Sequence, residues 1–580
     1  MKKRIVAVVL SLMTLICIST LCVNAASLGT PRMSSVSNVY GGVKVDWKGV
    51  SGADGYYVYR KTGSQKAWQR IATVTGRTKV SYTDKTIKSG EKGTYTVRAY
   101  KGKVVSKYDT TGKSRLYLSA PSVSLSATTA VSTKLSWKKV AGSSGYVIYQ
   151  KSSGDRSYKR IATVNNASTL TYTAKSLKAK TKYAFVVKAY NGNTYSSSSK
   201  AVAVTTKSRV KVKIGLICIH DQHSMYDSAF LNAFIATCKA MNFESDQGYV
   251  CMNVPETEAC YTAAKTLIKQ GCNLIISNSF GHESYMLKAA KNYPNVQFVS
   301  ISGTKAHTER LKNFHNAYGA VHEGKYLLGV AAGMKLNEMI KNKKITKDKA
   351  VLGYVGAYSY AEVISGYTAF YLGAKSVCPY VKMKVQNTGS WYDSTAEMNA
   401  AYSLISKGCV LISQYSDSIG VPSACAKKGV PNIAYNVDYT TKYPSTSLAS
   451  MHIDWQPYFM YCVKSVRDSV PMPYDYTATL KTGSVKILKI NGNVAAKGTA
   501  DTLKTVTNKM KNGSIKVFDT SKFTVNGKTI TKYKADVNTD MSFTPDTNVI
   551  VNGEFAESKF RSAPYFDMRI DGITVLNEIY

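Results

Sequence analysis

The chain has 580 residues, enough for three or four domains, and its 77 Lys and Arg against 35 Asp and Glu give a net charge of +42. The excess is uneven, because residues 27–206 hold 31 Lys and Arg against only 6 Asp and Glu. A basic surface favours anionic cell-wall polymers or lipid headgroups as partners. No recognition motif accompanies the charge, which argues against nucleic acid. A solvated basic face without a specific partner stays open as the alternative.

The first 26 residues have the three-part layout of a secretory signal peptide. Positive residues at 2–4 precede an apolar run over 5–23, and Ala25 and Ala26 follow it. A membrane anchor is the alternative, since the run is nearly long enough to span a bilayer, but polar residues within it favour cleavage. The residues before Cys17 and Cys22 do not fit a lipoprotein signal. We therefore predict a protein that is secreted to the cell surface or wall through a cleaved signal peptide at 1–26 and is not a lipoprotein.

A repeat with an offset of 90 residues follows, in which Trp47 matches Trp137. The segments 55–59, 70–74 and 95–100 recur at 145–149, 160–164 and 185–190. Their alternating Val, Tyr and Thr indicate half-buried strands, and the repeat has the size of an immunoglobulin-like sandwich. The early Trp, the G-Y-x-[VI]-Y strand and the late aromatic strand resemble fibronectin type III. The resemblance implies two all-β domains, at 28–116 and 117–206, that act as spacers or adhesive stalks.

From 207 to 475 short apolar runs alternate with amphipathic helical stretches, which is typical of an α/β domain. The first set of expected strands is 212–219, 249–254, 272–278 and 296–302, with helices at 227–241, 257–270 and 283–292. The second set has strands at 351–356, 381–386, 409–415 and 432–436, with helices at 362–377, 395–407 and 421–428. A helix at 324–342 joins the sets. They predict a two-lobed domain with two parallel sheets and a ligand in the cleft beyond the carboxyl ends of their strands.

The residues that follow the expected strands mix aromatic rings with carboxylates and amides. Aromatic faces can hold a flat ring, and carboxylates accept hydrogen bonds from ring N–H groups or sugar hydroxyls. These strand ends contain no Lys or Arg, which argues against phosphate-bearing ligands. The candidate ligand-binding residues are Tyr226, Asp227, Phe280, Glu362, Trp391, Ser416, Asp417, Asp438 and Trp455. Structural roles compete for some of them: Asp227 could cap a helix, Phe280 could be core packing, and a helix dipole favours Glu362.

Motifs of the α/β region resemble the basic membrane protein family, the purine-nucleoside-binding proteins of ABC importers. They lie at 279–281, 323–333, 353–356, 362–374, 391–393, 414–417 and 435–438. The resemblance covers about 211–470 and implies a type I periplasmic-binding-protein fold, a purine nucleoside or nucleobase stacked between aromatic rings, and an ABC transporter permease as partner. Three features depart from the family: Met225 stands where an aromatic residue usually meets the base, the lipoprotein signal is missing, and fibronectin-like modules are not standard.

Residues 476–580 alternate strand-like runs with Asn-Gly turns, which predicts a β-rich C-terminal extension packing on the lobes. The expected strands are 485–490, 515–517, 523–525 and 549–551. The seven His show no metal-ligand spacing, and the cysteines beyond residue 26 form no C-x-x-C pair, which favours buried thiols over metal clusters or disulfides. No metal or other cofactor is predicted.

The sequence thus predicts an extracellular solute-binding protein that captures a small purine nucleoside or nucleobase in an interlobe cleft for an ABC importer. A wall-attached purine receptor or adhesin that is not coupled to transport is the alternative. Nucleophile-elbow, metal and phosphate-loop signatures are absent, which argues against an enzyme such as a nucleoside hydrolase.

Overall fold

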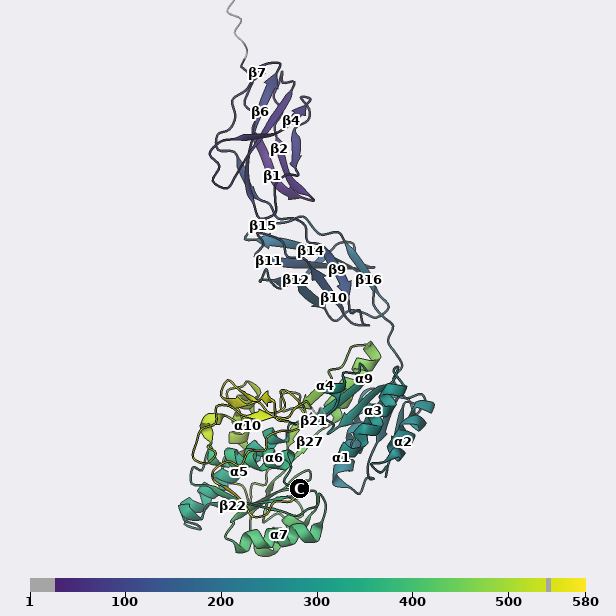
Figure 1. Cartoon of the computed structure of the whole chain (residues 1–580), viewed down its shortest axis with the longest axis vertical. Coiled ribbons are helices and arrows are strands. Elements are labelled where there is room, and N and C mark those ends of the chain that lie inside the picture. Colours follow the sequence, from purple (N-terminus) through teal and green to yellow (C-terminus); the bar gives the residue numbers. More distant parts are fainter. Residues whose placement is uncertain (1–26, 539–543) are drawn as a thin grey trace, which may run out of the picture. The chain divides into compact units, whose positions relative to one another are not determined.

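The computed structural model describes residues 27–538 and 544–580, and the chain divides after residue 208 into two compact units (Figure 1). The predicted signal peptide at 1–26 lies outside the described residues. Within the described ranges, no helix is both long and apolar enough to cross a membrane.

The first module of the N-terminal unit is a sandwich of two antiparallel sheets, as the repeat predicts. One sheet has the order β1-β2-β5, and the other has the order β4-β3-β6-β7 with β8 also paired to β6. The strands are β1 Met33–Val39, β2 Gly42–Trp47, β3 Gly55–Thr62, β4 Gln69–Thr75, β5 Ser81–Asp84, β6 Lys92–Lys101, β7 Val104–Val105 and β8 Lys113–Leu116. Between the sheets, the rings of Trp47 and Tyr56 meet edge to face at 5.2 Å.

The second module repeats this architecture. Its sheets have the orders β13-β10-β9 and β12-β11-β14-β15, with β16 paired to β14. The strands are β9 Val123–Ser126, β10 Thr133–Trp137, β11 Gly145–Ser152, β12 Lys159–Val164, β13 Thr171–Ala174, β14 Lys182–Asn191, β15 Thr194–Tyr195 and β16 Val202–Thr205. Trp137 and Tyr146 form the matching ring pair, again at 5.2 Å.

A buried ion pair distinguishes the first module. The Asp84 carboxylate is fully buried, with the Arg60 guanidinium at 2.7 Å and the Tyr95 hydroxyl donating to it at 2.9 Å. Burial alone would raise the pKa of Asp84, but hydrogen bonds from Thr86, Arg60 and Tyr95 outweigh it and hold the pKa below its usual value.

The second module fills the same positions without an ion pair. At an offset of 90 residues, Ala174 replaces the aspartate, Gln150 the arginine and Phe185 the tyrosine. Ala174 and Phe185 are both buried. The core of the second module is therefore apolar where the core of the first is ionic.

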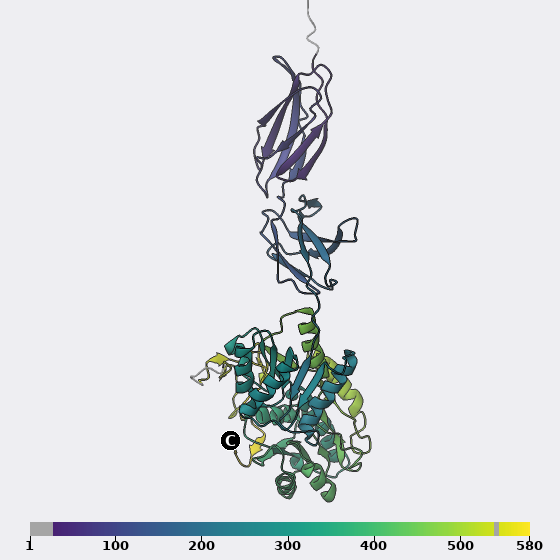
Figure 2. The same cartoon turned by 90° about the vertical axis from the view of Figure 1, so that its right-hand side faces the viewer.

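The C-terminal unit contains two six-stranded sheets with helices packed against them (Figure 2). The sheet of the first lobe is parallel and has the order β18-β17-β19-β20-β21-β28. Its strands are β17 Ile214–Ile217, β18 Gly248–Cys251, β19 Leu274–Ser277, β20 Gln297–Ile301, β21 Phe314–Gly319 and β28 Asp475–Ala478. Its helices are α1 Met225–Ala240, α2 Glu258–Lys269, α3 Glu283–Asn292, α4 Ala306–Glu309 and α9 Gln456–Asp468.

The sheet of the second lobe is also parallel and has the order β26-β25-β24-β22-β23-β34. Its strands are β22 Val351–Gly356, β23 Lys382–Asn387, β24 Leu411–Tyr415, β25 Asn432–Ile433, β26 Ser447–Ala449 and β34 Ile573–Val575. Its helices are α6 Ala361–Lys375, α7 Ser394–Ser406 and α8 Gly420–Lys428. All nine cysteines of the described residues are unpaired, and seven of them are buried.

Helix α5, Val321–Lys341, follows the first lobe and packs tightly on α6 of the second. A Cβ atom at Gly329 would lie 2.0 Å from the Phe370 carbonyl oxygen, and one at Gly373 would lie 2.0 Å from that of Tyr326. Glycine is therefore required on both helices for their backbones to approach this closely. The Gly-rich motif of α5 thus has a packing role at the junction of the lobes.

The C-terminal extension adds one strand to the sheet of each lobe. Strand β28 pairs with β21 of the first lobe, and β34 pairs with β23 of the second. The remaining elements are β29 Val485–Ile487 paired with β27 Met451–Ile453, α10 Thr499–Lys511, β30 Lys534–Ala535 paired with β31 Thr547–Asn548, and β32 Ile550–Val551 paired with β33 Glu554–Phe555.

Two strand predictions in the extension are wrong. The runs 515–517 and 523–525 lie outside the strands. Val517, Phe518 and Phe523 are buried, so these apolar runs pack into the core from irregular backbone. The sequence also did not predict helix α10.

Candidate functional site

Side chains near the strand ends of both lobes meet in one cluster. Tyr318 and Tyr415 are buried there, and Tyr226, Glu362, Asp417 and Tyr435 are half-buried. Tyr226 and Tyr318 come from the first lobe, and Glu362, Asp417 and Tyr435 from the second. Tyr318 of the first lobe interacts with the Glu362 carboxyl of the second, and after burial the negative charge of that carboxyl raises the pKa of Tyr318. The negative groups of Glu362 and Asp417 also raise the pKa of Tyr226, after burial as the main cause. We call these five residues and Tyr415 the junction cluster.

Glu362 lies in the first turn of α6, where the helix dipole favours a carboxylate. Its carboxyl accepts a hydrogen bond of 2.9 Å from the Tyr415 hydroxyl. Burial raises the pKa of Glu362, while the hydrogen bonds from Tyr318 and Tyr415 oppose the shift.

Asp417 follows β24 and is held by backbone and side-chain bonds. Its N–H donates to the Trp391 carbonyl at 2.9 Å, and its carboxyl accepts from the Asn436 amide at 2.7 Å. Burial raises the pKa of Asp417 to about 7, against the hydrogen bond from Asn436. Near neutral pH this group can therefore either accept or donate a hydrogen bond.

Aromatic rings form a wall beside these carboxyl groups. Tyr415 and Tyr435 stack at 4.8 Å, and Trp391 packs at 6.3 Å from Tyr415 and 5.6 Å from Tyr358. Tyr358 in turn stacks on Tyr360 at 5.0 Å. Such a wall suits a flat ring, and the adjacent carboxyl groups suit its N–H groups or sugar hydroxyls.

Lys325 of α5 lies fully buried behind this wall. Its ammonium donates to the Gln414 carbonyl at 2.6 Å and lies 4.5 Å from the ring centroid of Tyr435 and 5.1 Å from that of Tyr415. Burial lowers the pKa of Lys325 to about 7, and the charge of Asp417 opposes the shift. The rings thus carry a cation on one side, which cation–π attraction stabilises.

In the first lobe, hydrogen bonds hold Tyr226 in its position in the junction cluster. The Tyr226 hydroxyl donates to the Asn278 carbonyl at 2.6 Å. Asp227 is fully buried and accepts from the Asn278 amide at 2.7 Å and from the His220 N–H at 3.2 Å. Asp227 therefore fixes the first turn of α1, which carries Tyr226, against Asn278, while Ser224 caps the helix.

Apart from Asp227, which is buried against the Asn278 amide, the predicted site residues fall into two groups. Tyr226, Glu362, Trp391, Ser416 and Asp417 gather in or beside the junction cluster, with Ser416 buried next to Glu397.

The other three residues make different contacts in this structure, and whether they bind a ligand stays a prediction. Phe280 is 62% exposed in a short 3-10 helix, Phe280–His282. Asp438 is exposed and accepts from the Thr440 N–H at 2.8 Å. Trp455 is buried and stacks on Phe230 at 5.1 Å, which is a packing contact of the first lobe.

Two members of this site were missed by sequence reasoning. Tyr318 is the last residue but one of β21, a strand that the sequence did not predict, and Lys325 looks like an ordinary helix-surface lysine. Tyr435 was visible at a strand end, and its pairing with Tyr415 could have been inferred from neighbouring parallel strands.

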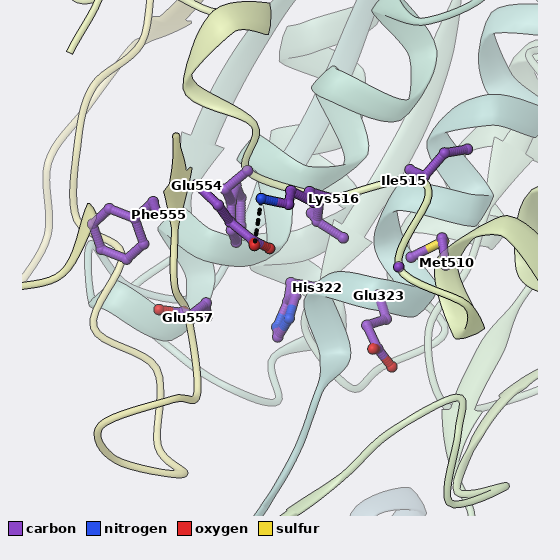
Figure 3. Close-up of a pocket in the computed structure, with 11 residues that line it drawn as sticks. His322, Glu323, Met510, Ile515, Lys516, Glu554, Phe555 and Glu557 are labelled. Atoms are coloured by element: carbon purple, nitrogen blue, oxygen red, sulfur yellow. Dashed lines mark ion pairs between the residues drawn. The ribbon is translucent and has the colours of Figure 1, made fainter. Parts of the chain in front are cut away.

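A separate cavity of about 250 Å³ lies between the start of α5 and three parts of the extension, namely the end of α10 and the segments 513–518 and 554–557 (Figure 3). Its lining includes His322, Glu323, Glu557 and the ion pair of Lys516 with Glu554 at 3.5 Å. Burial lowers the pKa of His322 to about 4 and raises those of Glu323 and Glu557 to about 7. None of the predicted site residues lines it. Across residues 27–538 and 544–580, no group of three or more His, Cys, Asp or Glu could hold a metal ion.

Comparison with known proteins places both units among described families. Residues 219–521 match the family model of PnrA-like ABC transporter substrate-binding proteins, and residues 119–205 match the fibronectin type III model.

Three relatives are similar to parts of the C-terminal unit. A purine-binding protein of Brucella abortus is 31% identical over 40% of this chain and 63% of its own length. A putative ABC transporter glucose-binding protein of Haloferax volcanii is 29% identical over 34% of this chain and 46% of its own length. An ABC transporter nucleoside-binding protein of Lactococcus lactis is 25% identical over 37% of this chain and 58% of its own length. The chain thus spans less than two thirds of each relative's length.

Proposed function

Because the chain belongs to the family of PnrA-like ABC transporter substrate-binding proteins, we propose that its C-terminal unit captures a purine nucleoside or nucleobase for an ABC importer. Its task is binding, not catalysis, and its partner is the importer's permease. We also propose that the chain is exported through the signal peptide at 1–26. Relatives named as purine-binding and nucleoside-binding proteins support the choice of ligand.

The junction cluster is the observation that carries this proposal. It combines stacked rings, Tyr415 on Tyr435, with the two carboxyl groups of Glu362 and Asp417. The flat face of a purine would pack on the aromatic wall, and its N–H groups or ribose hydroxyls would bond to the carboxyls. Entry requires the two lobes to separate between Tyr318 and Glu362, and a bound ligand would take the place of that contact.

Calorimetric titration of residues 27–580 tests the proposal. Adenosine, guanosine, inosine, adenine, uridine and glucose are compared, because one relative is named a putative glucose-binding protein. We expect a purine to bind with micromolar or lower Kd, and Asp417→Asn or Trp391→Ala to weaken it about tenfold or more. Asp501→Asn, an exposed carboxyl on α10, should leave Kd unchanged.

Two results would overturn the proposal. Tighter binding of glucose than of any purine would assign the site to sugars, and failure of all purines to bind would remove the ligand class. Asp438→Asn settles one further point: because Asp438 is exposed, we expect a much smaller effect than for Asp417→Asn.

A further inference from the structure

The larger sheet of the first module presents an outward face of aromatic and cationic side chains. On β3, Tyr57, Tyr59 and Lys61 alternate with Tyr56 and Val58, which are fully buried in the core. Because successive strand residues point to opposite sides, the first three face away from the sandwich interior. With Trp68, Arg98 and Tyr108 they form what we call the cation–aromatic face.

Ring contacts hold its cations in place. The Lys61 ammonium lies 4.6 Å from the Trp68 ring centroid, and the Arg98 guanidinium lies 5.5 Å from that of Tyr108. Tyr108 also contacts Tyr59 at 6.4 Å and Trp68 at 6.1 Å. The cations are thus ordered before any partner arrives, which lowers the conformational entropy lost on binding.

These cations have no anionic partner within the chain. Strands β3, β4 and β6 contain no Asp or Glu, and within the described residues no carboxylate lies within 4.0 Å of Lys61 or Arg98. The inward-facing Arg60, by contrast, is neutralised by Asp84. The positive charge on the outward face is therefore free to meet an external anion.

The spacing of the cations favours an extended anion. Lys61 is paired in register with Thr94, and Arg98 lies four residues further along β6. At about 3.3 Å per residue, their backbones are roughly 13 Å apart along the strands. A single small anion cannot contact both, whereas a polymer with repeated acidic groups can.

The second module shows that this face is not a consequence of fold or total charge. The first module has 18 Lys and Arg against 5 Asp and Glu, a net charge of +13, and the second has 13 against 1, a net charge of +12. Yet Val147, Tyr158 and Ser198 occupy the positions of Tyr57, Trp68 and Tyr108.

We propose that the cation–aromatic face of the first module binds an extended anionic polysaccharide, independently of purine capture by the C-terminal unit. Cations already cover faces of the Trp68 and Tyr108 rings, so those faces are not open for bases to stack on, as single-stranded nucleic acid requires. Acidic groups along a glycan need only the ordered cations. The total charge of the modules predicts an anionic partner, and the cation–aromatic face is where we expect it to bind.

Binding of residues 27–580 to immobilised polygalacturonate tests the proposal, with dextran as the neutral polymer and a single-stranded oligothymidylate as the nucleic acid. The variant Lys61→Gln/Arg98→Gln is compared with its counterpart Lys151→Gln/Lys188→Gln in the second module, which removes the same charge. We expect the first pair to weaken polygalacturonate binding at least tenfold and the second less than twofold. Trp68→Ala should weaken it several-fold without removing any charge.

Equal losses from both pairs would overturn the proposal in favour of diffuse charge attraction. Tighter binding to oligothymidylate than to polygalacturonate would assign the face to nucleic acid, and failure to bind polygalacturonate would also overturn it. Purine titration of the same variants should give wild-type Kd values.

Discussion

The two N-terminal modules have one architecture and nearly equal net charge, but they differ on both sides of the same sheet. Inside, the first module buries the ion pair of Asp84 with Arg60, where the second has Ala174 and Gln150. Outside, the second module keeps the two cations as Lys151 and Lys188, with Lys188 lying 5.7 Å from the Tyr149 ring centroid. It lacks the Trp68 and Tyr108 rings that contact the cations of the first module. What they share is the ring pair of Trp with Tyr at 5.2 Å.

The comparison teaches which interactions this fold requires. The apolar ring pair occurs in both modules and supplies a large buried area in each. A buried ion pair costs desolvation that its attraction offsets only in part, so an apolar replacement of similar volume can be equally stable. The fold therefore depends on the ring pair, while the ionic core and the outward face can vary.

Breaking the ion pair should give the largest effect on stability. Asp84→Ala leaves the Arg60 charge and the Tyr95 hydroxyl buried without their partner, and we expect a loss of about 3–5 kcal/mol in the first module. Native-state hydrogen exchange of the β3 and β11 amides measures the opening free energy of each module separately. The β11 amides should be unchanged.

A triple variant is the control for this loss. Asp84→Ala, Arg60→Gln and Tyr95→Phe together install the residues of the second module, and we expect most of the lost stability to return. If the triple variant were as unstable as Asp84→Ala alone, the apolar residues of the second module could not replace the ion pair of the first, and the prediction would be wrong.

The two modules should also differ in stability at low pH, by a smaller amount than the Asp84→Ala substitution causes. Because the folded pKa of Asp84 is lowered, its stabilisation is present above the usual value of 3.8 and is lost as pH falls through the folded value. Asp155 of the second module also has a lowered pKa, through bonds from Ser152 and Lys159, but it contributes little because this pair lies at the surface, with Lys159 exposed.

Pepsin digestion between about pH 2 and 5 measures this difference, with peptides identified by mass spectrometry. We expect cleavage within 28–116 to begin at a higher pH than cleavage within 117–206, because unfolding exposes the sites. Simultaneous cleavage of both modules would mean that Asp84 does not set the acid stability of the first.

Removing one hydroxyl from each shared ring pair should give the smallest effect. The Tyr56 hydroxyl accepts from the Val50 N–H at 3.0 Å and donates to the Arg77 carbonyl at 2.9 Å. The corresponding Tyr146 bonds are 3.1 and 3.4 Å. We expect Tyr56→Phe to cost about 1 kcal/mol and Tyr146→Phe somewhat less, by the same exchange measurement. A larger cost for Tyr146→Phe would contradict this ranking.

The sequence predicted the architecture where one signal dominates. The 90-residue repeat indicated both sandwiches, and alternating apolar runs indicated most strands of the two parallel sheets. Strand β21 was missed because His315 and Asn316 interrupt its apolar pattern. Both are buried, and His315 is satisfied by hydrogen bonds to the Pro473 carbonyl at 2.8 Å and the Gln297 side chain at 2.9 Å. Because these partners lie far from β21 in the sequence, the sequence around β21 does not reveal that its polar residues are buried.

The candidate site was only partly predictable for a related reason. A position after a strand indicates which edge of the sheet a residue occupies, but not the direction of its side chain. Asp417 is turned inward by the hydrogen bond from Asn436, whereas Asp438 is exposed and accepts a bond within its own turn. The role of Lys325 can be recognised only in the fold, which places two strand rings, Tyr354 and Tyr415, and the Tyr435 ring after β25 around its ammonium.

The pairing of β34 with β23 affects the order in which the second lobe folds. Asn387, at the end of β23, exchanges hydrogen bonds with Asn577 across 190 residues of chain. Contacts of such high sequence separation form slowly, because a long loop must close first. Until residue 577 has been synthesised, one edge of β23 is an unpaired template that another chain could join. A chain shortened by the residues of β34 should therefore aggregate during folding even though its ligand cluster is complete.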